Sequence, residues 1–153
     1  MKGYALAYKD KFIALLCYAV SMGYLEAAVV VYLRALYYPQ GFDVAMPIRF
    51  TAPIYQVDLF RETATIIMLL AVGYVSFTKM KDRIFAFFWL FAVWDLSYYI
   101  FLKLILGWPS SLKTFDILFL IPAPWIAPVW LPISISIATL TVITYLLFIK
   151  KRV

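Results

Sequence analysis

Four long apolar segments, separated by charged or proline-rich stretches, set the pattern of the chain. They cover residues 12–33, 57–77, 84–106 and 127–149. Each is close to the roughly 20 residues that cross the hydrocarbon core of a bilayer. Lipid offers the backbone no hydrogen-bond partner, so a spanning segment must form a helix, which satisfies its own polar groups. The pattern predicts an all-α, polytopic membrane protein whose four transmembrane helices form one domain, residues 1–153.

The composition supports this class and excludes several others. Apolar residues make up 66% of the 153 residues, charged residues make up 14%, and the mean hydropathy is +0.92. Soluble domains have about 45–50% apolar and about 25% charged residues. The chain contains no His, which removes the commonest zinc and haem ligand and the commonest general base. We therefore expect no metal and no cofactor. The scarcity of Asn, Gln and Cys hints at a thermophilic source.

Basic residues at the ends of the apolar segments predict how the chain is threaded. The net charge is +6, and three clusters hold nine of the 14 Lys and Arg residues. These clusters are Lys2, Lys9 and Lys11; Lys79, Lys81 and Arg83; and Lys150, Lys151 and Arg152. With four spans all three clusters share one side, which the positive-inside rule assigns to the cytoplasm. We therefore expect a cell-membrane protein with both termini cytoplasmic, whose partner is the lipid bilayer and not nucleic acid.

Two longer loops, residues 34–56 and 107–126, then face outward. The first contains three prolines, Pro39, Pro47 and Pro53, which do not extend a helix. The second contains a run of seven apolar or acidic residues at 115–121, which is too short to span a bilayer. We expect this run to form a short interfacial or re-entrant helix between the third and fourth spans. The candidate binding residues of this loop are Trp108, Asp116 and Trp125.

Ionisable residues inside the spans are the strongest functional signal in the sequence. Each costs on the order of 2.5–3.5 kcal/mol to insert, so it should face a partner, water or a ligand. Asp95, Tyr99 and Lys103 are four residues apart and share one helix face, and Arg61 is placed to reach a carboxylate on another helix, Glu26 or Asp95. The predicted binding or coupling cluster is Glu26, Arg34, Arg61, Glu62, Asp95, Tyr98, Tyr99 and Lys103.

The cluster has two interpretations, which are compatible. One is an interhelical network of salt bridges and hydrogen bonds that holds the bundle together, because buried charges pair when they can. The other is a cavity open to the outside, lined by carboxylates and tyrosines, because ionisable groups inside a membrane usually mark a binding or transport pathway.

Several strings resemble a small, uncharacterised family of prokaryotic four-helix integral membrane proteins. They are LEAAVVVYLRALYY at 25–38, RETAT at 61–65, WDLSYY at 94–99, LGWP at 106–109 and DILFLIP at 116–122. The family has no known activity, so the resemblance implies the four-helix fold and no function.

Three functions fit these features. The first is a small accessory or assembly subunit that associates with other membrane subunits or with itself, because the chain leaves no room for a soluble domain. The second is a small ion-coupled transporter or ligand-binding membrane protein, which would use the carboxylates at mid-depth. The third is an intramembrane lipid-modifying enzyme, which is least favoured because no catalytic motif is evident.

Overall fold

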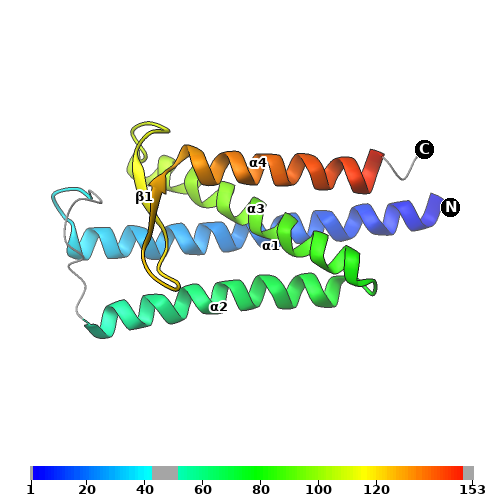
Figure 1. The fold of residues 1–153 in the computed structure, drawn as a ribbon, viewed down its shortest axis with the longest axis horizontal. Helices are drawn as coiled ribbons and strands as arrows, with labels where there is room; N and C mark the ends of the chain where they lie inside the picture. Colours follow the sequence, from blue (N-terminus) through cyan, green and yellow to red (C-terminus); the bar gives the residue numbers. More distant parts are fainter. Residues whose placement is uncertain (1, 43–51, 150–153) are drawn as a thin grey trace.

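The computed structural model describes residues 2–42 and 52–149. Four long helices form a bundle, and a β-hairpin joins the last two at one end (Figure 1). Pro47 of the predicted first outer loop and the basic cluster at 150–152 lie outside the described residues. The elements are α1 (Lys2–Tyr37), α2 (Ala52–Ser76), α3 (Met80–Leu106), β1 (Phe115–Phe119), β2 (Trp125–Pro128), α4 (Trp130–Thr144) and a π-helical extension of α4, η1 (Tyr145–Ile149).

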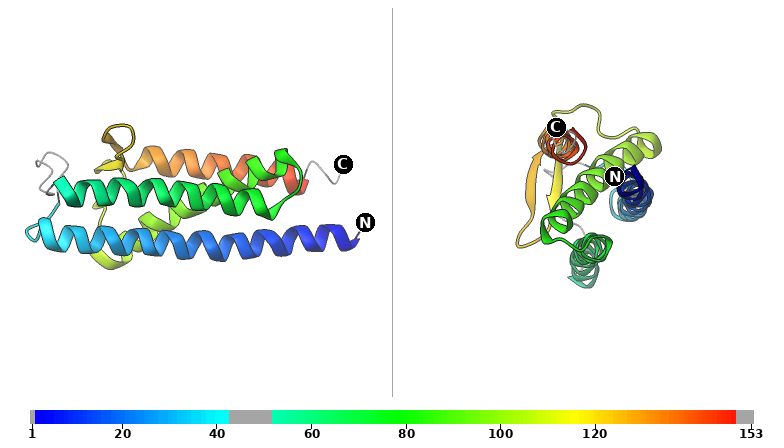
Figure 2. Two further views of the ribbon diagram at one scale, coloured as in Figure 1. Left: turned by 90° about the horizontal axis from the view of Figure 1, so that it is seen from below. Right: turned by 90° about the vertical axis from the view of Figure 1, so that its right-hand side faces the viewer.

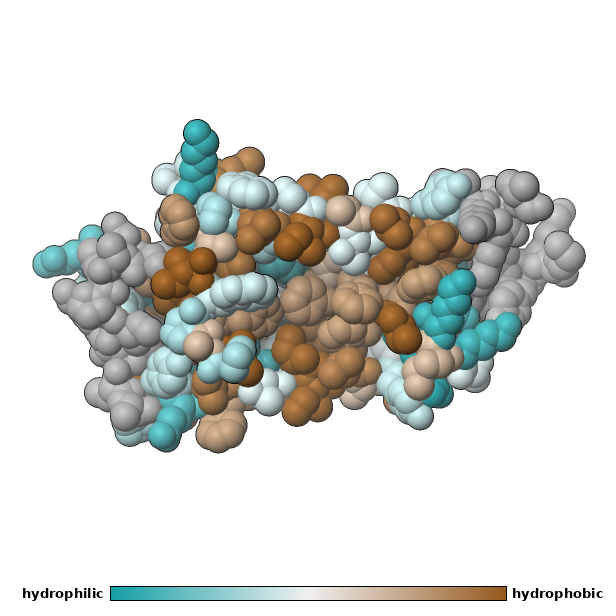
Figure 3. Space-filling view, viewed as in Figure 1, coloured by the Kyte–Doolittle hydropathy of each residue, from teal (hydrophilic) through white to brown (hydrophobic). Residues whose placement is uncertain are grey.

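All four helices are long and apolar enough to cross a membrane. The stretches that meet this criterion are Lys9–Tyr37, Pro53–Ser76, Met80–Leu106 and Trp130–Leu147. Apolar side chains cover the middle of the visible surface, and hydrophilic ones gather toward its ends (Figure 3). A soluble bundle would instead bury its apolar stripe and expose polar faces. The fold is thus compatible with a multi-pass membrane protein.

Helix α3 is the central element of the bundle. It packs against α1, α2 and α4, and it crosses the other helices obliquely when the bundle is viewed end-on (Figure 2). Gly23 allows α1 to approach α3 closely, because a Cβ at this position would lie 2.6 Å from the Cβ of Ser97 and 2.9 Å from the carbonyl oxygen of Trp94. At Gly73 on α2, a Cβ would lie 3.0 Å from the backbone nitrogen of Phe87. Small residues at such crossings are typical of helix packing in membranes.

Both ends of the described chain lie at the same end of the bundle as the turn between α2 and α3 (Figure 1). Basic side chains stabilise this end by donating hydrogen bonds to the backbone carbonyls where α2 ends. Lys11 Nζ donates to the Ser76 carbonyl at 2.9 Å, and Arg83 Nε donates to the Phe77 carbonyl at 2.7 Å. Cations are favourable at a helix C-terminus because the helix dipole is negative there. The hairpin lies at the opposite end.

The segment expected to form a short helix at 115–121 forms strand β1 instead. β1 pairs antiparallel with β2, with Phe115 opposite Pro128 and Phe119 opposite Trp125. Two physical reasons favour the strand. Bulky aromatic and β-branched side chains suit a pleated surface, and the prolines at 122 and 124 cannot supply the N–H groups that would continue a helix. The fourth helix accordingly begins at Trp130 and not at residue 127.

The described ends of the first outer loop also differ slightly from the predicted ones. α1 continues to Tyr37, one turn beyond the predicted end at residue 33. Pro53 lies in the first turn of α2, not in the loop. Proline is tolerated there because the first helical N–H groups have no partner within the helix.

Candidate functional site

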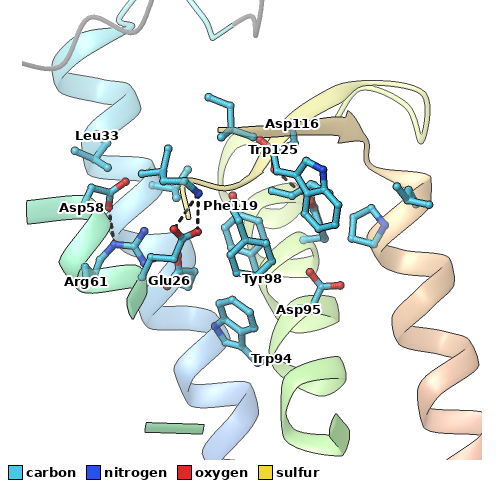
Figure 4. A pocket seen from close by; sticks show the side chains of 18 of the residues that line it. Glu26, Leu33, Asp58, Arg61, Trp94, Asp95, Tyr98, Asp116, Phe119 and Trp125 are labelled. Carbon is cyan, nitrogen blue, oxygen red and sulfur yellow. Dashed lines mark hydrogen bonds and ion pairs between the residues drawn. The ribbon is translucent and has the colours of Figure 1, made fainter. Parts of the chain in front are cut away.

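A cavity of about 280 Å³ lies at the hairpin end of the bundle. All four helices and the hairpin contribute to its wall, and the labelled side chains in Figure 4 converge on it from both sides of α3. Apolar and aromatic residues make up most of the lining, with Phe91, Trp94, Phe119, Leu131 and Ile135 among them. The polar lining residues are Glu26, Arg34, Tyr38, Asp58, Arg61, Glu62, Asp95, Tyr98, Tyr99, Asp116 and Ser136.

An ion-pair network joins α1 to α2 on one side of the cavity. Arg61 Nη1 contacts Glu26 Oε1, and Arg61 Nε donates to Asp58 Oδ1 at 2.6 Å. Glu26 is one of the two carboxylates that the sequence offered as partners for Arg61. All three side chains are largely buried, with 23% exposure for Arg61 and 13% and 12% for Glu26 and Asp58. Such short contacts to a charged group are among the strongest that a buried arginine makes.

Glu62 on α2 attaches the hairpin to the bundle. Both of its carboxylate oxygens accept the backbone N–H of Leu120, at 2.9 Å for Oε2 and 3.2 Å for Oε1. Leu120 directly follows β1, and its N–H would otherwise be buried without a partner in the sheet. An unsatisfied buried N–H costs about 1–3 kcal/mol, so this contact helps to hold the end of β1 over the cavity.

Asp116 on β1 makes a second attachment, to α1 and α3. Arg34 Nη2 lies 3.5 Å from its Oδ1, and the Tyr99 hydroxyl donates to its Oδ2 at 3.2 Å. Burial raises the pKa of Asp116 to about 6, although Arg34 and Tyr99 favour the charged form. The Arg34 guanidinium itself lies against two rings, 3.8 Å from the centroid of Trp108 and 4.4 Å from that of Phe42, in cation–π geometry.

Asp95 is the most isolated carboxylate of the cavity. The Ser136 hydroxyl of α4 donates to its Oδ2 at 2.8 Å. In the described part of the chain no Lys or Arg forms an ion pair with Asp95. Figure 4 shows its carboxylate below Trp125, on the α4 side of α3. A single neutral hydroxyl leaves most of the hydrogen-bonding capacity of a carboxylate unused.

The lining carries more acidic than basic groups. It contains five carboxylates, Glu26, Asp58, Glu62, Asp95 and Asp116, against the two guanidinium groups of Arg34 and Arg61. The three ion pairs of the described residues use three of these carboxylates, so Glu62 and Asp95 have only hydrogen-bond donors. Within the described ranges, no three His, Cys, Asp or Glu side chains are grouped to hold a metal ion. The cavity therefore presents two carboxyl groups without a cationic partner among aromatic rings.

The structure brings most of the predicted cluster together. Lys103 is the exception: its Nζ donates to the carbonyl oxygens of Gly107 and Pro109, at 2.9 and 2.8 Å, and the side chain does not line the cavity. Of the three outer-loop candidates, Asp116 and Trp125 line the cavity, whereas Trp108 does not; its ring lies against the Arg34 guanidinium. The predicted residues that line the cavity together are Glu26, Arg34, Arg61, Glu62, Asp95, Tyr98 and Tyr99.

Three groups that bind the charged side chains of the cavity were missing from the predicted cluster. Asp58 had a usable signal, because it lies three residues before Arg61 and so on the same helix face. Ser136 had none, since it is one of several hydroxyl residues in an apolar span. The N–H of Leu120 belongs to the backbone and leaves no trace in the sequence.

No protein-family model, curated protein or solved structure matches this chain.

Proposed function

We propose that this chain is a multi-pass membrane protein that binds a small molecule in the cavity at its hairpin end. The observation that carries the proposal is the cavity of about 280 Å³ among charged groups. Ligand sites are typically concave and mostly apolar with a few convergent polar groups, and ionisable residues within a membrane usually belong to a functional site.

A purely structural network explains these features less well. A network that serves only stability should pair its charges and leave little space, because protein interiors are close-packed. Here the cavity is many times larger than the roughly 10–15 Å³ that one water needs, and two of its carboxylates have no cationic partner among the described residues. Space together with unpaired charge favours a binding site.

We further propose that the hairpin end faces away from the cytoplasm. The basic turn with Lys79, Lys81 and Arg83 lies at the other end of the bundle, together with the N-terminus (Figure 1). The test starts from a chain in which Cys17, its single cysteine, is replaced by Ala. An impermeant maleimide should then label Lys113→Cys on intact cells, and Lys81→Cys only after permeabilisation. The reverse pattern would contradict the orientation.

Native mass spectrometry of the protein released from its membrane tests the binding function. We expect a mass for the chain with one additional small molecule that is not a detergent. Val30→Phe should abolish this adduct, because Val30 lines the cavity and a phenyl ring there fills part of the space. Val31→Phe is the matched control: it adds the same volume on the same helix, at a position that does not line the cavity.

Equal adducts in both variants, or none in the unmodified protein, would contradict the proposal. A chain that carries no small molecule but is released together with another membrane protein would favour the accessory-subunit role instead.

A further inference from the structure

We propose that the ligand is an amphiphile whose head group carries an ammonium, which is held at Asp95. This inference rests on the proposed binding function and specifies its ligand class. Two observations support it: the charge balance of the cavity and the surroundings of Asp95.

The charge balance indicates a cationic ligand. Five carboxylates and two guanidinium groups line the cavity, and burying unpaired ionised groups is costly. Both oxygens of Glu62 share the single N–H of Leu120, so this carboxylate is turned toward the end of β1. Among the described residues Asp95 accepts a hydrogen bond only from the Ser136 hydroxyl, through Oδ2, which leaves Oδ1 for a ligand.

The surroundings of Asp95 suit an ammonium that carries an apolar body. The Trp125 ring lies above its carboxylate in the view of Figure 4, and aromatic rings attract cations. Leu131 and Ile135 of α4 continue the wall from there. Ile135 is 57% exposed on the bundle surface, so an alkyl chain can run from the cavity along α4 toward the lipid.

Two probes with the same chain length and hydroxyl, one cationic and one neutral, test the ligand class. N-decylethanolamine carries a protonated amine and a hydroxyl, whereas N-decanoylethanolamine has the same chain length and hydroxyl with a neutral amide. Equilibrium dialysis measures their Kd for the protein in dodecyl maltoside micelles, with protein-free micelles as the baseline. We expect the amine to bind about tenfold tighter or more, the size expected for a charge-assisted hydrogen bond.

Asp95→Asn should remove this preference and leave the affinity for the amide within about twofold of wild type. Unchanged amide binding also shows that the variant is folded. Asp10→Asn, which removes an exposed carboxylate at the other end of α1, is the matched control and should keep the preference. Adding phosphatidylethanolamine to the micelles separates two sources of the head group: competition with the amine indicates a membrane lipid, and no competition indicates a free amine.

Equal affinity for the two probes, or an unchanged preference in Asp95→Asn, would overturn the ammonium inference. The binding function would still stand if Val30→Phe abolished the binding of both probes. An adduct in native mass spectrometry with neither probe bound would likewise overturn only the ligand class. Absence of any adduct and of any probe binding would overturn both proposals.

Discussion

Replacing Asp116 by Asn is expected to hold the hairpin more tightly at neutral pH, although it removes one partner of the ion pair with Arg34. Burial raises the pKa of Asp116 from its ordinary 3.8 to about 6, and contacts with Arg34 and Tyr99 offset only part of this effect. The ionised carboxylate is therefore less favourable in the closed hairpin than the neutral acid. Asn resembles the neutral acid in shape and keeps an oxygen that accepts hydrogen bonds.

The two pKa values set the pH range and the size of the effect. In an open hairpin Asp116 regains water, and its pKa returns to 3.8 from about 6. Between these values the closed form holds a proton that the open form has lost, so each pH unit weakens closure by about 1.4 kcal/mol. The stabilisation that protonated Asp116 gives to the closed hairpin is fully present below pH 3.8 and is lost by about pH 6. The total is about 3 kcal/mol, on the order of a 100-fold rise in the open population.

Hydrogen–deuterium exchange of the peptide that covers β1 measures hairpin opening between pH 4.5 and 7.5, after correction for the intrinsic pH dependence of amide exchange. In the wild type, the protection of the β1 amides should decrease as the pH rises to about 6 and stay constant above it. The charged and titratable groups facing Asp116 are Arg34 on α1 and Tyr98, Tyr99 and Asp95 on α3. Subtracting the Asp116→Asn profile removes the contributions of these groups and isolates Asp116.

At pH 7.5 the Asn variant should be the better protected protein, and its corrected profile should lack the fall below pH 6. Asp10→Asn removes an exposed carboxylate far from the hairpin and should leave the profile unchanged. Weaker protection of β1 in Asp116→Asn than in the wild type would show that the ion pair with Arg34 outweighs the cost of burial, and it would refute the reasoning.

Three further predictions concern the stability of the bundle, each measured by thermal unfolding in mild detergent unless stated. Arg61→Gln should destabilise the protein by about 3–5 kcal/mol because it leaves two buried carboxylates unpaired, whereas the exposed Lys113→Gln should change it by less than about 0.5 kcal/mol. Gly23→Ala should destabilise the protein by about 1–3 kcal/mol through overpacking. Gly73→Ala should destabilise it less, because the new Cβ would lie 3.0 Å from the nearest atom of α3 and not 2.6 Å, as at position 23. Glu62→Ala should increase exchange of the hairpin amide that it accepts by about tenfold or more, whereas Glu62→Gln, which keeps an oxygen acceptor, should have a smaller effect.

The four helices were predictable because a span must be both long and apolar, and few other structures need such a segment. The charged residues of the site were predictable for the complementary reason. Glu26, Arg61, Glu62 and Asp95 stand out in apolar surroundings, where each needs a partner. The pairing of Arg61 with a carboxylate on another helix followed from the poor geometry of its pair with the adjacent Glu62.

The hairpin was not predictable in the same way. A short apolar run reads equally well as a strand or as a buried helix, and the choice here depends on pairing with a segment beyond two prolines. Asp116 accordingly looked like a residue of an outer loop, although it is 3% exposed between α1 and α3. The contact of Glu62 with a backbone N–H could not be inferred from side-chain chemistry at all.

The order of synthesis gives the hairpin a further consequence for folding. The ion pair between α1 and α2 can form as soon as these two helices have been made. Arg34 and Glu62 must instead wait for partners that leave the ribosome 82 and 58 residues later. Pairing of the first two helices and closure of the hairpin end are therefore separate events, and between them the charged groups of α1 and α2 that the hairpin contacts are still uncovered.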